Sequence, residues 1–563
     1  MQKFLTFFLL LAFISHAQTP YPTDYFRHPL DVTIIPSGTF GELRSNHFHS
    51  GMDIKTQQRE GLKVFATADG YISRIKIAHF GYGKALYVTH PNGYTTVYAH
   101  LQQLSPTLEA YIKKLQYEQE SFEIEIFPKV DELPVLKGDL IAFSGNTGSS
   151  GGPHLHYEIR DNAERPINPL LFGVDITDTT KPIITEVYAY PISEDSHINA
   201  TKERQKLRLI NTPNGDYTVE NIQAFGKIGF AIEANDRQDL ASNKNGVENI
   251  QAFYNGNQKF EMDFKRFTFD ESRLLNRYID YGHYSDKKEK LQKLFVESGN
   301  NLSMLKNIDD DGYIHVEDST SSVYKVRVKD FHNNDVWLTI NIEGLKATDV
   351  KSKEIVETPF HIYSKKANEL INKNVSVYFP QDAFFDDFYI NFEVNNDTIT
   401  LHEDTIPLRE NFTITYDISS FKNQDSDKLY IARLVGWRKQ YTIYSKTYRK
   451  ENTLTTYNKT LGTYALTVDN VNPTIKPINF TEGKWLSKYR FLKLKIEDEG
   501  SGISNYRATI NGKWILMEYD YKTNLLVYDF NDNISTETKN NLKVIVTDNV
   551  GNNSTFETTF FRK

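Results

Sequence analysis

Alternation of apolar and polar side chains is the main pattern in the first third of the chain. Side chains alternate across a strand with a period of two, so alternating runs predict strands with one buried face. Asn92-Gly93 separates two such runs and predicts a tight hairpin turn. Together these features predict a strand-rich domain that extends to residue 176. The runs that carry the pattern lie at 63–67, 70–78, 84–90 and 94–101.

One segment of this domain changes period. In 108–120 the apolar residues Leu108, Tyr111, Ile112 and Leu115 fall on one face of a helix. The predicted helix is an insertion after Leu101, ahead of another strand-like run that begins near residue 138. We expect it either to form a rim over a groove or to be a surface decoration.

The remainder of the chain contains a weak internal repeat. Residues 502–515 resemble 246–260, and both contain an Asn-Gly turn, while 542–552 echo 324–334 with a closing V-x-D strand. Short strands with regular turn signals are typical of β-sandwiches. After a linker at 177–182, this pattern predicts three modules. They are an immunoglobulin-like sandwich at 177–345 with a helical insertion at 270–295, a β module at 346–468, and a second immunoglobulin-like sandwich at 469–563.

The N-terminus reads as a secretory signal peptide. Lys3 supplies a basic start, 4–14 are apolar, and Ser15-His16-Ala17 gives a small-residue cleavage pattern. An uncleaved anchor is disfavoured, because the apolar run is shorter than the ~20 residues that span a bilayer. We therefore expect 1–17 to be removed and the protein to be exported to the periplasm or cell surface. No later segment is apolar and long enough to predict a stable membrane span.

Composition narrows the class of protein. A chain of 563 residues is too long for one core and predicts roughly four domains. With 34 Tyr and 36 Phe against 5 Met, it favours a mostly all-β fold. The net charge of −8 and the lack of a Lys/Arg block argue against a nucleic-acid partner. With no cysteine, disulfides and thiolate metal sites are excluded.

Two histidines in the run 151–161 are the first candidates for chemistry. If this run is a strand, Leu155 and its i+2 neighbours face a core, while His154, His156, Glu158 and Arg160 share the other face. Two imidazoles on one face could bind or flank a metal, and they could equally be solvated.

Partners for these histidines lie upstream in "HSGMD". His49 and Asp53 flank Gly51, which argues for a turn, with His47 as a rival for His49. Together with one histidine of the later pair they would make three N/O ligands. Three ligands leave a fourth tetrahedral position for water, which is the arrangement of a catalytic zinc site.

His100, in "YTTVYAHL", is a further candidate. On a regular strand Tyr98 and His100 would share one face, and Val97, Ala99 and Leu101 the other. A histidine at a strand end can transfer protons near neutral pH, or it can be an ordinary hydrogen-bonded residue. After residue 176 the histidines His283, His332 and His402 are scattered, and no catalytic constellation is evident there.

Taken together, "HSGMD", "YAHL" and "HLH" occur in the order that is found in the lysostaphin-like, or LytM-type, zinc endopeptidases, which cut peptidoglycan cross-bridges. The neighbouring text "GYGKALYVTHPNGYTTVYAHL" and "KGDLIAFSGNTGSSGGPHLHYEIRD" also resembles this family, over about residues 40–170. The resemblance implies one Zn²⁺ per chain, bound by His49, Asp53 and His156. It implies that His100 and His154 are the catalytic histidines, and that an antiparallel sheet forms the floor of a groove.

Several expectations depend on this resemblance. The insertion after Leu101 is longer than expected, which affects substrate preference rather than chemistry. Glu158 is a candidate base, or a residue that pairs with Arg160 or supports a ligand, and Tyr98 is a candidate for the same supporting or substrate-binding role. We expect the face that bears His100, His154 and His156 to be solvated.

The leading functional hypothesis is a secreted metalloendopeptidase whose partner is the peptide of peptidoglycan. The alternatives are a non-catalytic adaptor that binds wall or activates another hydrolase, and a zinc protease acting on extracellular proteins. The C-terminal β modules are expected to position the enzyme through wall, protein partners or self-contacts, or to act as spacers.

Overall fold

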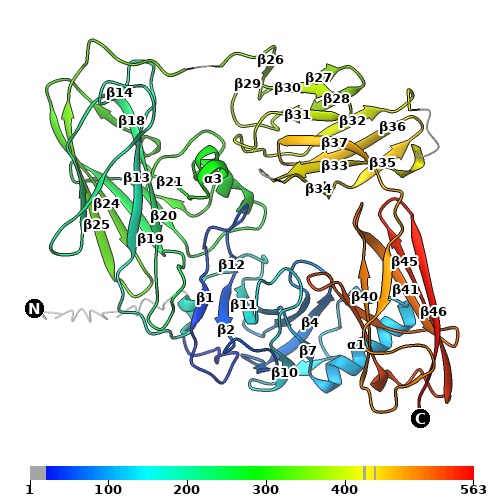
Figure 1. The fold of residues 1–563 in the computed structure, drawn as a ribbon. Helices are drawn as coiled ribbons and strands as arrows, with labels where there is room; N and C mark the ends of the chain where they lie inside the picture. Colours follow the sequence, from blue (N-terminus) through cyan, green and yellow to red (C-terminus); the bar gives the residue numbers. More distant parts are fainter. Residues whose placement is uncertain (1–20, 355, 422–425, 437–438) are drawn as a thin grey trace, which may run out of the picture.

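The computed structural model describes residues 21–354, 356–421, 426–436 and 439–563. The predicted signal peptide at 1–17 lies outside them. The fold is mostly all-β, as predicted, and four successive segments each contribute a hydrophobic core. We refer to them as the N-terminal module (21–176), second module (177–345), third module (346–468) and C-terminal module (469–563). Figure 1 shows the chain curving back, so that the C-terminal module lies beside the N-terminal module.

An antiparallel sheet dominates the N-terminal module, and its strand order places β11 between β2 and β6. Leu155, Tyr157 and Ile159 of β11 lie in the core, as their alternation predicts. The predicted Asn92-Gly93 turn joins β5 to β6, with Gly93 at φ 87°. The path of the sheet is β1 (Pro36–Gly38), β2 (Met52–Lys55), β11 (His154–Arg160), β6 (Thr95–Ala99), β5 (Lys84–Thr89), β4 (Gly70–Ile77) and β8 (Ile124–Ile126).

A smaller sheet of three strands, β3-β10-β7, packs in the same module. Its strands are short, and β10 is the middle one. Their bounds are β3 (Lys63–Phe65), β10 (Leu140–Phe143) and β7 (Gln103–Leu104).

The predicted helical insertion is confirmed as α1 (Pro106–Gln119). Proline stands in its first turn, where no hydrogen-bonded N–H is lost, and the helix ends at Glu120 in the left-handed region. Leu108 and Ile112 are buried in the core of the N-terminal module. The helix therefore rests on its own module through the face that the sequence predicts.

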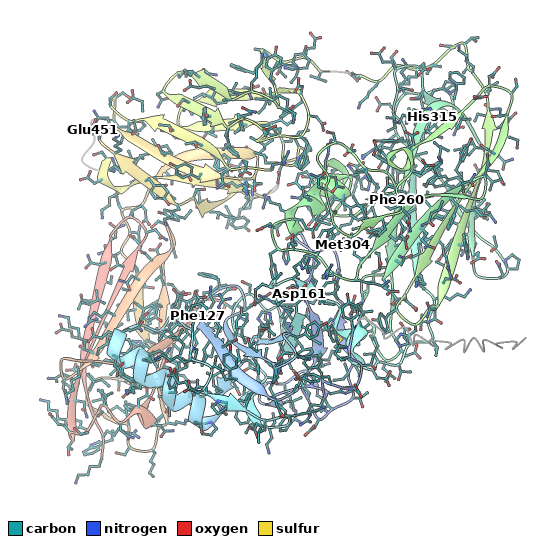
Figure 2. The ribbon with its side chains drawn as sticks, turned by 180° about the vertical axis from the view of Figure 1, so that it is seen from behind. Phe127, Asp161, Phe260, Met304, His315 and Glu451 are labelled. Carbon is teal, nitrogen blue, oxygen red and sulfur yellow. The ribbon has the colours of Figure 1, made fainter. Side chains whose placement is uncertain are left out.

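The second module is a large sheet in which the long strand β18 (Ile222–Asn235) pairs with β13 on one side and β25 on the other. Phe260 and Met304 lie among its strands in the core (Figure 2). The other strands along its path are β15 (Gln205–Lys206), β13 (Ile183–Pro191), β25 (Asp335–Gly344), β24 (Ser321–Lys329), β19 (Asn249–Tyr254), β20 (Asn257–Asp263) and β22 (Leu305–Lys306).

The helical insertion predicted at 270–295 is only partly helical. It contains a 3₁₀ turn, η2 (Ser272–Leu274), and the helices α2 (Leu275–Tyr278) and α3 (Tyr281–Lys287), followed by the short strand β21 (Gln292–Lys293). Its C-terminal end adds to the sheet, because Gln292 and Lys293 pair with β18. The expectation of a helical insertion therefore overestimated the length of helix in this segment.

The third module has two five-stranded sheets around one core. One sheet follows the order β27 (Asn368–Asn372), β28 (Val375–Phe379), β32 (Phe412–Asp417), β36 (Thr453–Asn458) and β35 (Thr447–Lys450). The other follows β30 (Phe392–Asn395), β31 (Thr398–Leu401), β37 (Gly462–Val468), β33 (Leu429–Val435) and β34 (Tyr441–Tyr444).

The C-terminal module also has two sheets around one core, and it confirms the internal repeat. Its Asn511-Gly512 turn joins β41 to β42 just as Asn255-Gly256 joins β19 to β20. One sheet follows β38 (Thr474–Pro477), β40 (Phe491–Glu497), β44 (Leu525–Asp529) and β43 (Met517–Asp520). The other follows β39 (Lys484–Trp485), β46 (Asn553–Phe561), β45 (Lys539–Asp548), β41 (Ile503–Ile510) and β42 (Lys513–Trp514).

The C-terminal module docks on α1. Asp532 accepts hydrogen bonds from Lys113 Nζ at 2.6 Å and Tyr117 Oη at 2.8 Å. The Tyr117 ring also lies edge-on to Trp514, with centroids 5.2 Å apart. The outer face of the insertion is therefore an intramolecular contact surface.

The segment that precedes β2 packs into the second module. Phe40 and Phe48 belong to the core of that module, and Phe48 lies against Phe264 and Phe267. The backbone N–H of Phe48 donates to Ser272 Oγ at 2.9 Å. Residues from both sides of the linker at 177–182 thus share one core.

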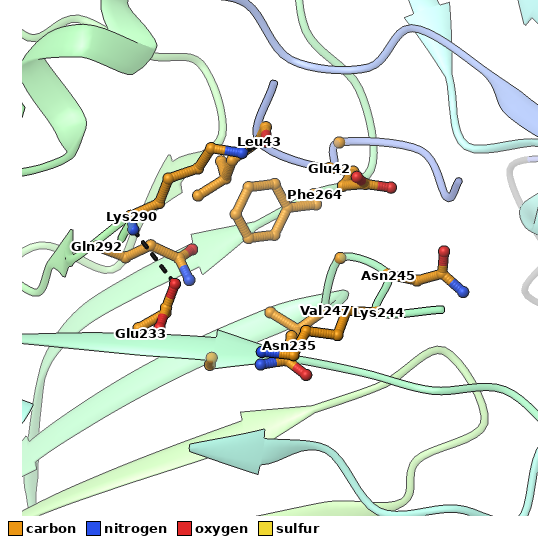
Figure 3. A pocket seen from close by; sticks show the side chains of 13 residues that line it. Glu42, Leu43, Glu233, Asn235, Lys244, Asn245, Val247, Phe264, Lys290 and Gln292 are labelled. Carbon is orange, nitrogen blue, oxygen red and sulfur yellow. Dashed lines mark hydrogen bonds between the residues drawn. The ribbon is translucent and has the colours of Figure 1, made fainter. Parts of the chain in front are cut away.

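A small cavity marks the same junction. It has a volume of about 150 Å³ and lies between residues 41–43 and the second module (Figure 3). The N–H of Lys290 donates to Glu233 at 3.3 Å, and the side-chain amine of Lys290 donates to the Leu43 carbonyl. These bonds hold the loop before β2 on the second module.

None of the helices in the described ranges is both long and apolar enough to cross a membrane.

Candidate metal centre

Three side chains from two strands and a loop converge on one face of the main sheet. His49 Nε2 lies 3.0 Å from Asp53 Oδ1 and 3.1 Å from His156 Nδ1, and Asp53 Oδ1 lies 2.9 Å from His156 Nδ1. All three residues are buried. Tetrahedral zinc with ligands at about 2.0–2.1 Å sets those ligand atoms about 3.3 Å apart. The observed triangle is close to this size.

Strand register places two of these residues side by side. On β11, His156 is paired with Asp53 of β2 on one side and with Ala99 of β6 on the other. Paired residues point to the same face of a sheet, so the carboxylate and the imidazole must meet. His49 comes from the loop just before β2, where Gly51 lies so close to Tyr157 that any side chain would clash with its carbonyl.

Main-chain hydrogen bonding orients the His49 ring. Its Nδ1 lies 2.7 Å from the carbonyl oxygen of Thr39, so the Nδ1–H donates there and the Nε2 lone pair faces the cluster. Thr39 is itself bonded to the second module, because Gly246 N–H donates to its hydroxyl at 3.0 Å. The ligand orientation thus depends on contacts between modules.

His156 is oriented in the opposite sense by Glu158. The His156 Nε2–H donates to Glu158 Oε1 at 2.8 Å, which leaves Nδ1 to face Asp53 and His49. A carboxylate behind a ligand histidine is common in zinc sites, where it fixes the ring and raises its basicity. The sequence-based expectation that Glu158 pairs with Arg160 is confirmed, since Arg160 Nε donates to Glu158 Oε2 at 2.6 Å.

Charge explains why these buried groups are tolerated. Burial lowers the pKa of His156, but hydrogen bonds with Asp53 and Glu158 outweigh burial and raise it to about 9. Burial raises the pKa of Asp53, but its interactions with His49, His154 and His156 lower it well below its usual range. A cation bound here would take the place of the proton on His156 Nδ1.

His100 and His154 lie beside this triangle. Their ring centroids are 4.8 Å apart, and that of His100 is 5.8 Å from that of His156. His100 Nδ1 lies 2.9 Å from the Thr147 carbonyl, and His154 Nδ1 lies 2.8 Å from the Gly152 carbonyl. Each Nδ1–H therefore donates to the main chain. His154 Nε2 reaches to 3.4 Å from Asp53 Oδ1.

Burial, and then the neighbouring rings of His156 and His154, lower the pKa of His100 to about 3. The ring is therefore neutral around pH 7, and its Nε2 is a proton acceptor. His100 also has a left-handed backbone, with φ 60°. Non-glycine residues at such φ are uncommon and concentrate at functional sites, at a cost of about 1–3 kcal/mol.

The left-handed backbone also corrects the expected facing of β6. Tyr98 and Leu101 both lie in the main core, whereas Val97 and Ala99 form a small cluster on the opposite, histidine-bearing face. The alternation shifts by one residue at His100, because a residue with positive φ does not continue the strand. Tyr98 thus lies on the far face, with its hydroxyl bonded to Thr67, and the expectation that it shares a face with His100 is wrong.

Two other expectations need correction. The face that bears the histidines is not solvated, because His156 and Glu158 are 3% and 0% exposed. His47 does not compete with His49, since it is exposed and its Nδ1 lies 2.8 Å from Asn46 Oδ1.

Three supporting residues were missed in the sequence. Arg44 donates to Asp53 Oδ2 at 2.9 Å, while the hydroxyls of Ser50 and Tyr82 both donate to Glu158 Oε1. Ser50 and Tyr82 stand within the family-like text, so proximity to the motifs was the available signal. Arg44 stands five residues before His49, in a loop where no pattern singled it out.

A cavity of about 780 Å³ opens beside the cluster. Asp53 and His154 line it, together with Arg44, Lys55 and the backbone of 151–153. The two oxygens of Asp53 divide their contacts, with Oδ1 facing the histidines and Oδ2 facing Arg44. An extended chain can therefore reach the triangle from this side.

The donor set is that of a hydrolytic metal site. Two imidazoles and one carboxylate are the ligand types of catalytic zinc, and three protein ligands leave one position for a reacting molecule. Two further imidazoles border that position. The arrangement can hold a divalent cation and move protons next to it.

Two segments of the chain match described families. Peptidase family M23 matches residues 47–117, and a Zu5-like domain matches residues 360–469. The first match contains His49, Asp53 and His100, and the second coincides with the third module.

Similar proteins carry names from cell-wall metabolism. The chain is 32% identical over 160 residues to the DD-carboxypeptidase/endopeptidase Mpg of Neisseria meningitidis, which is 28% of this chain and 28% of Mpg. It is 30% identical over 158 residues to the murein hydrolase activator NlpD of Salmonella typhimurium, which is 28% of this chain and 34% of NlpD. The chain thus spans about a third of the length of these relatives, or less.

Among solved structures, the catalytic domain of lysostaphin from Staphylococcus simulans is 21% identical. That likeness covers 25% of this chain and 93% of the lysostaphin domain, with a TM-score of 0.19. The sequence similarities and the residues of the triangle point to the same family. The N-terminal module of this chain is a peptidase family M23 domain of the LytM type.

Proposed function

We propose that this protein is a zinc-dependent endopeptidase that hydrolyses peptide cross-links of bacterial peptidoglycan. The observation that carries the proposal is the triangle of His49, Asp53 and His156, bordered by His100 and His154. The names of the relatives support peptidoglycan as the substrate. The proposal includes export to the periplasm or cell surface through the predicted signal peptide at 1–17.

The residues present fit zinc. His49 Nε2, Asp53 Oδ1 and His156 Nδ1 would hold it, and each has a partner behind it in Thr39, Arg44 or Glu158. When bound, zinc supplies Lewis acidity, which makes a water molecule nucleophilic near neutral pH and polarises a carbonyl. Arg44 donates to Asp53 Oδ2, which leaves Oδ1 to face the histidines.

His100 and His154 would handle the protons. Both Nδ1–H groups are held by carbonyl oxygens, so each ring presents Nε2 toward the cluster. A neutral Nε2 accepts a proton, and the resulting imidazolium can donate it to the leaving amine or to a developing oxyanion.

Variants of the histidines test the proposal in the full-length chain. We expect His156→Ala and His49→Ala to lose both zinc and cleavage of purified muropeptides. We expect His100→Ala and His154→Ala to retain zinc and to lose about 10²–10⁴-fold in turnover. His47→Ala is the matched control, because this exposed histidine lies outside the triangle and should change neither property.

The readouts are zinc content by elemental analysis and product formation by mass spectrometry. Full turnover in His100→Ala or His154→Ala would remove the role assigned to that ring. A wild-type chain that retains zinc and cleaves purified proteins but not sacculi would point to a protease of extracellular proteins.

A second candidate function is a non-catalytic activator of another hydrolase, which the likeness to NlpD favours. An adaptor of this kind does not need metal. The complete set of zinc-type donors argues for the enzyme. Absence of zinc from the purified wild-type protein, with no cleavage after zinc is added, would decide for the activator.

A further inference from the structure

Three aspartates meet where the N-terminal module joins the second module. Asp178 lies in the linker before β13, Asp236 directly follows β18, and Asp330 directly follows β24. One carboxylate oxygen of each lies within 4.8 Å of the others. All three residues are at least nine-tenths buried, with Asp236 only 1% exposed.

Such a cluster is unstable without a counter-charge. Burial, and then the charges of Asp178 and Asp330, raise the pKa of Asp236 to about 8. Burial also raises the pKa of Asp178 to about 6. The His332 ring faces the cluster, with its Nδ1 4.0 Å from Asp178 Oδ2. Buried carboxylates of this kind must either hold protons or share a cation.

Hydrogen bonding leaves one oxygen without a partner. Asp330 accepts from Asn334 N and Nδ2, at 2.9 and 2.7 Å, and Asp178 Oδ1 accepts from Thr180 N at 3.1 Å. Asp236 Oδ2 accepts from Gln238 at 2.6 Å, whereas the buried Asp236 Oδ1 has no partner. Buried polar atoms are almost always satisfied, so this oxygen points to an additional ligand.

The C-terminal module contains the same arrangement. Asp469 lies in its entry linker, Asp498 follows β40 and Asp548 is the last residue of β45, and these three also cluster within 4.8 Å. Asn552 Nδ2 donates to Asp548 Oδ2 and to the Asp469 carbonyl, both at 2.7 Å.

Asn334 Nδ2 makes the equivalent bonds in the second module, to Asp330 Oδ2 and to the Asp178 carbonyl at 3.2 Å. The unpartnered oxygen recurs too, on Asp498 Oδ1. Two modules thus keep the same buried oxygens open at the same place in the fold.

We propose that Asp178, Asp236 and Asp330 bind a calcium ion. The donors are all oxygens, which argues against zinc, because zinc prefers imidazole and thiolate ligands. Calcium accepts irregular sets of carboxylate and carbonyl oxygens, whereas magnesium requires near-octahedral geometry and retains water. The ion would join the linker to the ends of β18 and β24 and so fix the N-terminal module on the second module.

Calcium titration of the full-length protein tests this assignment. The titrations use the zinc-loaded Asp498→Asn chain, in which the parallel triad is disabled, in buffer freed of calcium. We expect it to bind one calcium ion by calorimetry and to unfold at a higher temperature with calcium. Adding Asp236→Asn should weaken binding at least 10-fold and abolish the calcium-dependent shift.

Asp239→Asn is the matched control. Asp239 lies in the same loop, outside the triad, and bonds to Thr179 and Thr180. We expect this change to leave calcium binding intact. No binding up to about 10 mM calcium in the Asp498→Asn chain would overturn the proposal, since extracellular modules bind at about 10⁻⁴–10⁻³ M. Unchanged affinity after Asp236→Asn would also overturn it, and equal affinity for magnesium would overturn the choice of ion.

Discussion

Glu158 supports the candidate metal centre, although it does not touch the metal position itself. It is fully buried and accepts hydrogen bonds from His156, Arg160, Ser50 and Tyr82. Arg160 and His156 lower the pKa of Glu158 below its ordinary range despite burial, which raises it. The carboxylate therefore stays ionised and holds the His156 ring with Nδ1 toward Asp53.

Replacing this charge should weaken the metal centre. We expect Glu158→Gln to lower zinc affinity about 10–100-fold, the usual effect of removing the partner of a ligand histidine. Competition with a chromophoric chelator measures the affinity. Glu164→Gln is the matched control, because Glu164 also pairs with Arg160, at 3.1 Å, but is exposed. Equal zinc affinity in Glu158→Gln and wild type would contradict this role.

At the level of single residues, the sequence motifs predicted which side chains meet. The alternation of apolar and polar residues was a less reliable guide to the face on which each side chain lies. The spacing of His154 and His156 on one strand gave the correct face for each. The facing of Tyr98 and His100 was wrong, because positive φ at His100 shifts the alternation and nothing in "YAHL" reveals it. Arg44 was missed, since its position depends on how a loop folds back toward Asp53.

Among the elements, helix α1 was predicted from the period of its apolar residues. Its contact with the C-terminal module was not predicted. A helical period reports only the buried face of the helix, here Leu108 and Ile112. The outer residues Lys113 and Tyr117 meet Asp532, which is more than 400 residues later in sequence. Polar contacts at that separation have no periodic signature.

Weakening this contact should loosen the helix without affecting zinc. Asp532 is nearly buried, and hydrogen bonds to a charged group contribute about 1.5–3 kcal/mol. We expect Asp532→Asn to speed amide hydrogen exchange in the second half of α1 by roughly 10-fold, since 1.4 kcal/mol is a factor of ten. Asp529→Asn, beside a half-exposed arginine, should leave exchange in α1 unchanged. Unaltered exchange in both variants would show that the docking contact contributes nothing.

At the scale of the whole molecule, the modules are not independent domains. The boundary at 176–177 was chosen from composition, yet Phe40 and Phe48 belong to the core on the far side of it. Sequence shows where a linker runs, but it does not show which earlier segment folds across that linker. The loop that carries His49 therefore takes its conformation from both modules.

This shared core predicts a distant effect on the metal centre. Phe48→Ala should destabilise the protein by about 3–5 kcal/mol, the usual cost of a cavity left by a buried phenylalanine. It should also lower zinc affinity, because the adjacent His49 loses its anchor. Thermal unfolding and chelator competition measure the two effects. Phe127→Ala, at a 69% exposed position, is the control and should change neither. Normal zinc affinity in Phe48→Ala would show that the Phe48 anchor does not hold His49 in place.

The position of Phe48 also has a consequence for biosynthesis. When a ribosome has made only the N-terminal module, the phenyl ring beside His49 has no core to enter, because β19, β20 and β24 do not yet exist. We therefore expect the triangle of His49, Asp53 and His156 to stay unassembled until β24 has emerged from the ribosome. The order of translation would thus set the moment at which the candidate metal centre can form.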